Sequence, residues 1–462
     1  MIAVETYRDR AVGVFGLGRS GLAAARALAA GGARVLAWDD AEARRQAAAD
    51  IALVAPSRQA WSELAALVLS PGVPLSHPAP HPVVGLAGEL GVEVVGDVEL
   101  FARARPRARV VAITGTNGKS TTTALTGHLL RSAGWAVAVG ANLGRPVLDL
   151  EPLEERGVYV LELSSYQIDL TRSLRPAVAV LLNLSPDHLD RHGDMAGYIA
   201  AKRRLFEIAG ERAVAVVGVD DDDCAAIAEA LAASGRDVVR IAVGREIEDG
   251  LYVVDGCLVR AQQGKRRESA SLAGIETLRG THNWQNAAAA VATVSALGLE
   301  ATAIQRGLAS FPGLPHRLQR VGEIDGIVFV NDSKATNAEA AARALAAYDQ
   351  VFWIAGGRPK AGGIAGLAPL FPRIARAYLI GEAAPEFART LQGQVAFELS
   401  GDLVTAVMSA YRDASAAVGA GRIVLLSPAC ASFDQFADFE ARGDRFARVV
   451  ADLAVNKRAA AS

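Results

Sequence analysis

The stretch "VVAITGTNGKSTTTALTGHLL", residues 110–130, joins an apolar run to a glycine-rich turn and then to a helix-forming segment. A buried strand that enters a helix through such a turn presents backbone N–H groups that bind anions. The usual phosphate-binding loop reads G-x-x-x-x-G-K-[ST]. Here Ile113 stands where the first glycine belongs, and the loop that starts at Gly115 is two residues shorter. The stretch predicts a strand–loop–helix unit of an α/β fold and leaves open whether the short loop binds a nucleotide.

Side chains of the same stretch suit a bound nucleoside triphosphate. Lys119 adds a positive charge for the outer phosphates, and the hydroxyl of Ser120 can bind Mg²⁺. The residues that we expect to contact ATP here are Gly115, Thr116, Asn117, Gly118, Lys119, Ser120 and Thr121. The plainer alternative is a glycine-capped helix start with an exposed lysine, and it leaves the polar residues on both sides of the glycine unexplained.

Two polar residues follow later strands of the same region. Glu162 ends the apolar run "VYVLELSS", residues 158–165, where an ionised carboxylate is costly to bury without a partner. His188 lies in "SPDHLDRHG", again directly after a strand. Each alone is more often an ordinary polar group, and the spacing of His188 and His192 is a weak metal signal. Since the carboxyl ends of parallel strands meet at one sheet edge, we expect Glu162 and His188 to converge on the loop.

Length and composition narrow the class of protein. At 462 residues, with 51% hydrophobic and 21% charged residues, the chain is predicted to fold into roughly three globular domains. The 48 basic and 50 acidic residues give a net charge of -2, which provides no general attraction for nucleic acid or an anionic membrane. Three widely spaced cysteines suggest neither disulfides nor a zinc site. We expect a cytoplasmic protein without membrane insertion.

Apolar strands alternate with helical stretches along the chain, which predicts three α/β domains, each with a mainly parallel sheet. The charged stretch "RARPRAR", residues 103–109, and the proline-marked "SFPGLPHRLQR", residues 310–320, are the predicted boundaries. The expected domains are a Rossmann-like one over residues 1–107, a central phosphate-binding one over 108–312 and a Rossmann-like one over 313–462.

The first domain contains a rival signal. Residues 16–21 read Gly-Leu-Gly-Arg-Ser-Gly after a strand, and Asp39 follows about twenty residues later, which satisfies the dinucleotide fingerprint. An NAD-dependent oxidoreductase that uses this motif is therefore a less favoured alternative. A nucleotide-binding protein without catalytic activity is a third alternative, ranked lowest.

Seven motifs in order along the chain resemble the Mur ligases of peptidoglycan synthesis. They are "GTNGKSTT", "ELSSYQ", "NLSPDHLDRH", "HNWQNAAAA", "PHRLQ", "NDSKATN" and "LSPACASFDQFADFEARGDRF". The shortened loop is the form usual in this family. The last two motifs look like those of the member that adds D-glutamate to UDP-N-acetylmuramoyl-L-alanine; a sister ligase that adds another amino acid is the closest alternative. The resemblance implies ATP-dependent amide formation through an acyl phosphate.

The resemblance also implies roles for individual residues. Lys119 would serve the ATP phosphates, Ser120 and Glu162 would hold one Mg²⁺, and His188 would hold a second. Lys202 matches a lysine that the family carbamylates into a further metal ligand. Of the remaining ATP contacts, Asn286 would contact adenine, Arg317 the phosphates and Asp332 the ribose.

Two further groups of residues follow from the same match. The residues implied in binding the UDP-linked substrate are Gly18, Arg19, Ser20, Asp39, Gly72, Asn142, Gln167 and His188. Those implied for D-glutamate are Lys334, Thr336, Lys360, Ser432 and Phe433. The chain departs from the family at residues 39–41, Asp-Asp-Ala, where relatives often have a basic residue, and at Arg358-Pro359. We expect small-molecule substrates only, and a monomer.

Overall fold

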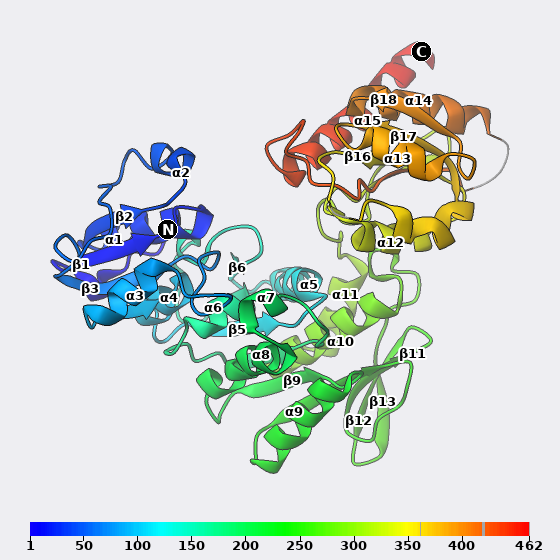
Figure 1. Ribbon diagram of the computed structural model, residues 1–462. Coiled ribbons are helices and arrows are strands. Elements are labelled where there is room, and N and C mark those ends of the chain that lie inside the picture. The colour runs from blue at the N-terminus through cyan, green and yellow to red at the C-terminus, as the bar shows by residue number, and fades with distance from the viewer. Residues whose placement is uncertain (361, 418–420, 462) are drawn as a thin grey trace. The chain divides into compact units, whose positions relative to one another are not determined.

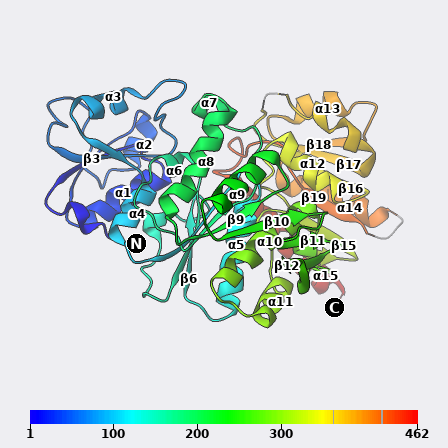
Figure 2. The same ribbon diagram turned by 90° about the horizontal axis from the view of Figure 1, so that it is seen from below.

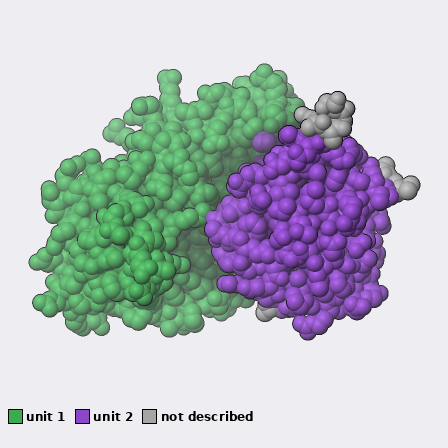
Figure 3. All heavy atoms as spheres, turned by 90° about the horizontal axis from the view of Figure 1, so that it is seen from above, with its two compact units in different colours: residues 1–311 green, residues 312–462 purple. Residues whose placement is uncertain are grey.

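The computed structural model of the protein describes residues 1–360, 362–417 and 421–461. The chain forms two compact units, residues 1–311 and 312–462, coloured separately in Figure 3. Three sheets, mostly parallel, and the helices around them confirm the predicted α/β class (Figure 1). The second unit begins at Pro312, within the proline-marked stretch. The predicted boundary after residue 107 lies inside the first unit and stays a prediction.

The first sheet consists of four parallel strands in the order β2-β1-β3-β4. Its strands are β1 (Ala11–Phe15), β2 (Arg34–Trp38), β3 (Leu64–Leu69) and β4 (Glu93–Val95). The helices of this region are η1 (Glu5–Tyr7), α1 (Arg19–Ala30), α2 (Glu42–Gln46), α3 (Pro82–Glu89) and α4 (Asp97–Ala104). The chain runs from β1 to β2 on one side and then crosses back from β2 to β3 on the other side of β1. Ligands of such sheets bind outside the strand ends at this switch point, which places a candidate site beyond β1 and β3.

The central sheet has nine strands in the order β13-β12-β11-β10-β9-β8-β5-β7-β6. Seven parallel strands are β5 (Arg109–Thr114), β6 (Val137–Ala141), β7 (Val158–Glu162), β8 (Val178–Leu181), β9 (Val214–Gly218), β10 (Val238–Val243) and β11 (Gly250–Val254). The antiparallel strands β12 (Cys257–Gln262) and β13 (Lys265–Ser271) extend its edge. Its switch point lies at β5, between β7 and β8, so the loops after these three strands meet.

Helices cover both faces of the central sheet, which explains why its parallel strands are continuous apolar runs. They are α5 (Lys119–Ser132), η2 (Val147–Asp149), α6 (Ser165–Asp169), α7 (Leu189–His192), α8 (Met195–Ala209), α9 (Asp222–Ala233), η3 (Glu276–Leu278), α10 (Thr281–Ala296) and α11 (Ala301–Ala309). Figure 2 shows α8 and α9 on one side of the sheet and α5, α10 and α11 on the other.

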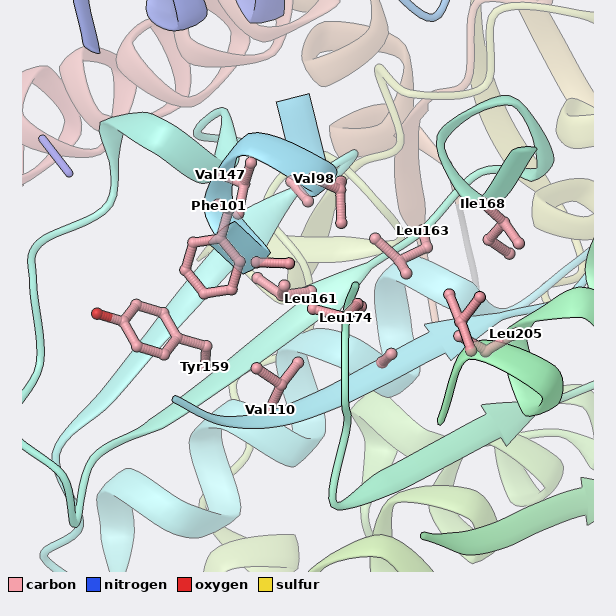
Figure 4. Close-up of a cluster of buried hydrophobic side chains, with 14 of the residues drawn as sticks. Val98, Phe101, Val110, Val147, Tyr159, Leu161, Leu163, Ile168, Leu174 and Leu205 are labelled. Atoms are coloured by element: carbon pink, nitrogen blue, oxygen red, sulfur yellow. The ribbon is translucent and has the colours of Figure 1, made fainter. Parts of the chain in front are cut away.

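The buried core of the first unit is continuous between its two sheets. Val98 and Phe101 of α4 belong to the same apolar cluster as Tyr159 and Leu161 of β7 (Figure 4). The rings of Phe101 and Tyr159 meet edge to face with centroids 5.0 Å apart. Helix α4 therefore joins the first sheet to the central one by packing as well as by the chain.

The second unit contains a six-stranded sheet in the order β14-β15-β19-β16-β17-β18. Only β14 (Gln319–Ile324) is antiparallel; the others are β15 (Ile327–Asn331), β16 (Val351–Gly356), β17 (Ile374–Ile380), β18 (Phe397–Gly401) and β19 (Ile423–Leu426). Its helices are α12 (Ala338–Ala346), η4 (Ala365–Arg373), α13 (Ala384–Leu391), α14 (Leu403–Ala416) and α15 (Phe439–Ala461). Strand β19 lies between β15 and β16, so the loops after these three strands are neighbours.

Among the described residues, no helix combines the length and the apolar character needed to cross a membrane. The cysteines, Cys224, Cys257 and Cys430, are free thiols.

Candidate active site

The short glycine loop between β5 and α5 is closely packed from both sides. Gly115 has φ +151°, and a Cβ there would come within 2.9 Å of the Leu182 side chain. Gly118, with φ +84°, caps α5, and a Cβ would lie 2.1 Å from Oδ1 of Asn286. Both positions require glycine because of the backbone angle and the lack of space. The loop thus lies directly against Asn286, the residue implied in adenine binding.

Lys119 folds back over this loop. Its Nζ donates hydrogen bonds to the carbonyl oxygens of Gly115 at 2.9 Å and Thr116 at 2.8 Å. The helix that it begins has no side-chain cap in the described part of the chain, so its first N–H groups point along the loop. Positive charge and helix N-terminus therefore act on the same space, the arrangement that binds phosphate. Ser120 and Thr121 occupy the first turn of α5.

Glu162 ends β7 next to the glycine loop. Its side chain is buried, Oε1 accepts a hydrogen bond from Nδ2 of Asn142 at 2.6 Å, and Oε2 has no partner in the described structure. The backbone N–H of Asn142 also donates to the Glu162 carbonyl at 3.0 Å. A buried carboxylate oxygen without a donor is costly, and Oε2 of Glu162 is such an oxygen.

Lys202 on α8 is buried below the loop and is 2% exposed. Its Nζ donates to the Gly115 carbonyl at 2.9 Å and contacts Thr114 Oγ1 at 3.4 Å. Burial, followed by the nearby charge of Lys119, lowers the pKa of Lys202 to about 7, against smaller opposing effects that include Glu162. The structure therefore brings Lys119, Glu162 and Lys202 within electrostatic range of one another.

His188 lies at the edge of this group. Its φ of +53° is left-handed and its side chain is half exposed, with Nε2 3.5 Å from Oδ2 of Asp187. His192, four residues on, turns inward: its Nε2 contacts Ser165 Oγ at 2.8 Å and its ring stacks on Tyr166. The two histidines are thus engaged differently, and no group of three His, Cys, Asp or Glu side chains suited to a metal occurs among the described residues. Metal binding by His188 stays a prediction.

A cavity of about 590 Å³ lies at the switch point of the first sheet. Predicted residues that line it are Gly18, Arg19, Ser20, Asp39, Gly72, Asn142 and Gln167. The structure therefore brings seven of the eight residues implied for the UDP-linked substrate to one cavity; His188 is not among its lining residues. Asn142 and Gln167 reach it from the central sheet, so the cavity is built by both sheets of the first unit.

Asp39 is already engaged in this cavity. Its oxygens accept hydrogen bonds from the backbone N–H groups of Leu17 at 2.7 Å and Ala41 at 2.8 Å, and Arg44 lies 3.3 Å away. Burial acts to raise the pKa of Asp39, but these hydrogen bonds and the Arg44 charge outweigh it and lower the pKa. Arg44 and His81, which were not identified from the sequence, also line the cavity. Arg44 follows the strand by six residues, so the motif pattern gave no signal for it.

Asp332 and Arg317 lie at the start of the second unit. Asp332 is 5% exposed; Oδ2 accepts from Ser427 Oγ at 2.8 Å and Oδ1 from the Leu318 N–H at 3.2 Å. Burial raises the pKa of Asp332 to about 7, opposed by these hydrogen bonds. Arg317 is half-buried on the loop before β14. Ribose and phosphate contacts by these residues stay predictions.

The residues implied for D-glutamate come from three neighbouring strand ends of the second unit. Lys334 and Thr336 follow β15, Lys360 follows β16, and Ser432 and Phe433 follow β19. Lys334 is half-buried, with Nζ 5.9 Å from the centre of the Phe439 ring, and Lys360 is exposed.

Two of these loops are tied together by Arg442, which was not identified from the sequence. Its guanidinium is buried and donates to the carbonyls of Ser333 at 2.9 Å and Cys430 at 3.1 Å. Its Nε also donates to Ser333 Oγ at 3.0 Å. The backbone N–H of Arg358 donates to the Ala431 carbonyl at 2.9 Å, which joins the third loop. Arg358, where the chain departs from the family, thus helps to hold these three loops together through its backbone.

Two family models match parts of this chain. Residues 113–294 match the family described as Mur ligase middle domain, and residues 316–430 match Mur ligase, glutamate ligase domain. The chain is 54% identical over 459 residues to UDP-N-acetylmuramoylalanine--D-glutamate ligase of Nitrobacter winogradskyi (strain Nb-255), with 98% of each chain covered. It is 55% identical over 462 residues to the protein of the same name from Caulobacter vibrioides, again over 98% of each.

Solved structures extend the likeness in fold. UDP-N-acetylmuramate-alanine ligase from Thermotoga maritima matches with a TM-score of 0.57 at 18% identity, over 96% of this chain and 100% of that one. A MurF structure from Acinetobacter baumannii matches with a TM-score of 0.56 at 20% identity, over 84% and 87%. At these identities the structures support the fold alone.

Proposed function

The chain belongs to the Mur ligase family, and we propose that it joins D-glutamate to UDP-N-acetylmuramoyl-L-alanine in an ATP-dependent reaction of peptidoglycan precursor synthesis. The observation that carries this function is an identity of about 54% over 98% of the chain to ligases named for that reaction. The convergence of Lys119, Glu162 and Lys202 on the glycine loop supports an ATP-dependent amide-forming ligase.

The chemistry explains why these residues are needed. A carboxylate accepts an amine only after one oxygen becomes a leaving group, so the alanyl carboxylate attacks the γ-phosphorus of ATP and ADP departs. The amine of D-glutamate then attacks the acyl phosphate; the new C–N bond replaces the C–O bond, and phosphate leaves. Two anions must approach each other in the first step, which requires positive charge and fixed positions. Lys119 and the start of α5 supply both for ATP.

We propose that Glu162 and Ser120 hold Mg²⁺. The fit rests on the buried Oε2 atom of Glu162, which has no hydrogen-bond partner while Oε1 is fixed by Asn142. Oxygen atoms of this kind are the ligands that Mg²⁺ prefers. Bound there, Mg²⁺ would neutralise charge on the transferring phosphoryl group. A second ion at His188 is part of the same proposal.

We propose further that Lys202 is carbamylated. The reaction needs a neutral amine: the nitrogen attacks CO₂, a C–N bond forms, and the nitrogen loses a proton to leave a carbamate anion. Burial makes the neutral amine accessible near neutral pH by lowering the pKa of Lys202 to about 7. A buried cation beside Lys119 would thereby become a carboxylate-like oxygen donor for metal, which also removes the repulsion between the two lysines.

The positions of positively charged side chains suggest where the UDP group and D-glutamate bind. We propose that the UDP group binds in the 590 Å³ cavity, where Arg19 and Arg44 supply positive charge in place of the basic residue that the family often has after β2. D-glutamate would bind in the second unit, where Lys334 and Lys360 face two carboxylates.

The alternatives are weaker on specific grounds. An NAD-dependent oxidoreductase is less favoured because relatives at about 54% identity over nearly the whole chain are named as ligases. A sister ligase that adds another amino acid shares the fold and the ATP chemistry, and only the relatives' names and the second-unit motifs favour D-glutamate. We also propose a cytoplasmic monomer; the free thiols suit a reducing compartment.

Amino-acid-dependent release of phosphate from ATP tests the function. With Mg²⁺ and UDP-N-acetylmuramoyl-L-alanine, D-glutamate should support release, whereas L-glutamate, L-alanine or no amino acid should not. Release with L-alanine and the unalanylated sugar instead would identify a sister ligase. No release with any acceptor would contradict the ligase assignment.

A further inference from the structure

The carboxyl group of Asp97 lies below the UDP-substrate cavity, where three helices begin. Asp97 is the first residue of α4 and is 2% exposed. Nε2 of Gln167, in the first turn of α6, lies 3.4 and 3.3 Å from its Oδ1 and Oδ2. Burial raises the pKa of Asp97, and hydrogen bonds from the side chains of Gln167 and Ser20 oppose that effect. Ser20 belongs to the first turn of α1, so Asp97 interacts with both other helices.

These contacts fix which way the Gln167 amide points. Its Oε1 accepts from the N–H of Ser164 at 3.2 Å and from the Ser164 hydroxyl at 3.3 Å, in a capping box that starts α6. Since a backbone N–H can only donate, Oε1 must face Ser164, and Nε2 must therefore face the acceptor oxygens of Asp97. The protein itself therefore holds both ends of the Gln167 amide: Ser164 holds Oε1 and Asp97 holds Nε2.

The two side chains that contact Asp97, Ser20 and Gln167, belong to two different walls of the cavity. Ser20 comes from the glycine loop of the first sheet and Gln167 comes from the central sheet, and both line the cavity. The backbones of α4 and α6 also approach closely, because the Gly96 N–H donates to the Leu170 carbonyl at 3.2 Å. A Cβ at Gly96 would lie 2.9 Å from Leu170 Cβ. Asp97 thus connects the two walls of the cavity and fixes the position of one relative to the other.

We propose that Asp97 is a positioning residue for the UDP-linked substrate: it holds Gln167, and with it Ser20, in the arrangement that binds this substrate. The inference rests on the proposed function, since it concerns the same cavity. Asp97 itself is not a substrate contact, because its carboxyl group is buried under the two residues that line the cavity.

The substitution Asp97→Asn tests this role because its effect on hydrogen bonding is determined. Oδ1 accepts from the Val98 N–H at 3.0 Å, so the asparagine oxygen must occupy that position. The new NH₂ group then takes the place of Oδ2 about 3.3 Å from Nε2 of Gln167, so this donor keeps only Oδ1, at 3.4 Å, as an acceptor and faces a second donor beside it. We expect the loss of one acceptor and the repulsion between the two NH₂ groups to displace Gln167 and to weaken binding of UDP-N-acetylmuramoyl-L-alanine about tenfold by calorimetry without ATP. The Michaelis constants for ATP and D-glutamate should stay within about twofold.

Glu99, two residues along α4, provides the matched control. It is a second buried carboxylate, and its oxygens accept hydrogen bonds from Arg103, Arg172 and Ser173. None of these residues lines the cavity. Glu99→Gln places an amide group against donors just as Asp97→Asn does, so it should lower the melting temperature but leave substrate affinity within about twofold. An equal loss of affinity in both variants would mean general loosening and would overturn the proposal.

A double-mutant cycle shows whether Asp97 acts through Gln167. In a Gln167→Ala background the opposing donor is gone, so Asp97→Asn should change the substrate dissociation constant by no more than about twofold, compared with about tenfold in the wild-type background. Equal effects in the two backgrounds would overturn the proposal. If the wild-type protein itself did not bind UDP-N-acetylmuramoyl-L-alanine, the proposed function would fail first, which distinguishes the two failures.

Discussion

Replacing Lys202 by methionine will stabilise the protein at pH 7 by about 2 to 4 kcal/mol and lower its ligase turnover by about 10³-fold. The stabilising effect follows because a buried ammonium group loses its hydration, whereas methionine fills similar space without charge. The activity loss follows from the proposed carbamate, which methionine cannot form. Urea unfolding in CO₂-free buffer, where Lys202 carries no carbamate, measures the first effect, and D-glutamate-dependent phosphate release in buffer with bicarbonate measures the second.

The effect of Lys202 on the free energy of unfolding depends on pH. The pKa of Lys202 is lowered from 10.5 to about 7 in the folded protein, so between these values the unfolded chain binds a proton that the folded chain does not. The Lys202 contribution to stability therefore rises with pH across this window and is constant below it. The difference between the variant and the wild type should be largest below about pH 7 and should shrink as the pH rises toward 10.

Arg203 supplies the control for Lys202. It is the next residue of α8, and its side chain is 57% exposed. Arg203→Met should leave both the unfolding free energy and turnover nearly unchanged. If Lys202→Met instead lowered stability together with activity, Lys202 would be a structural residue whose charge is satisfied by the Gly115 carbonyl.

Lys334→Ala should raise the Michaelis constant for D-glutamate by an amount equivalent to roughly 2 to 5 kcal/mol. The reason is that the two carboxylates of D-glutamate lose a cation at a half-buried position at the start of the loop after β15. The Michaelis constant for UDP-N-acetylmuramoyl-L-alanine should change little, because the cavity assigned to it lies in the first unit. Steady-state kinetics with each substrate varied in turn measures both constants.

Lys457 is the matched lysine for that experiment. It lies on α15 of the same unit, is half exposed and pairs with Asp325 at 3.4 Å. Lys457→Ala should leave the D-glutamate constant unchanged, since exposed ion pairs contribute little. An unaltered D-glutamate constant in Lys334→Ala would remove Lys334 from the amino-acid site.

Local patterns were sufficient to predict much of the fold. Apolar runs that end in glycine or polar turns mark parallel strands with their loops at one edge, which is why Gly115, Glu162 and Lys334 could be placed at strand ends from sequence. The charged residues 103–109 suggested a linker, yet α4 continues to Ala104 and β5 begins at Arg109, with only four residues between. The charged residues of this stretch are not all solvent-exposed linker residues, because Arg103 is partly buried and forms an ion pair with Glu93 at 2.7 Å.

The polar residues that were missed share one physical cause. Asp97, Glu99 and Arg442 are buried, and each has a hydrogen-bond partner 70 or more residues away in the sequence. A single acid at a helix start looks like an ordinary favourable charge near the helix N-terminus. What gives these residues their roles is the tertiary structure, which sequence spacing does not contain.

The most direct test of the central claim uses UDP-N-acetylmuramoyl-L-alanine labelled with ¹⁸O in both oxygens of the alanyl carboxylate. In the presence of ATP, Mg²⁺ and D-glutamate, one labelled oxygen should leave in the released phosphate and the other should remain in the new amide, because the carboxylate attacks the γ-phosphorus. Mass spectrometry of the phosphate would then find one ¹⁸O in each molecule. Unlabelled phosphate would show that ATP is hydrolysed without activating the carboxylate, and would contradict the account.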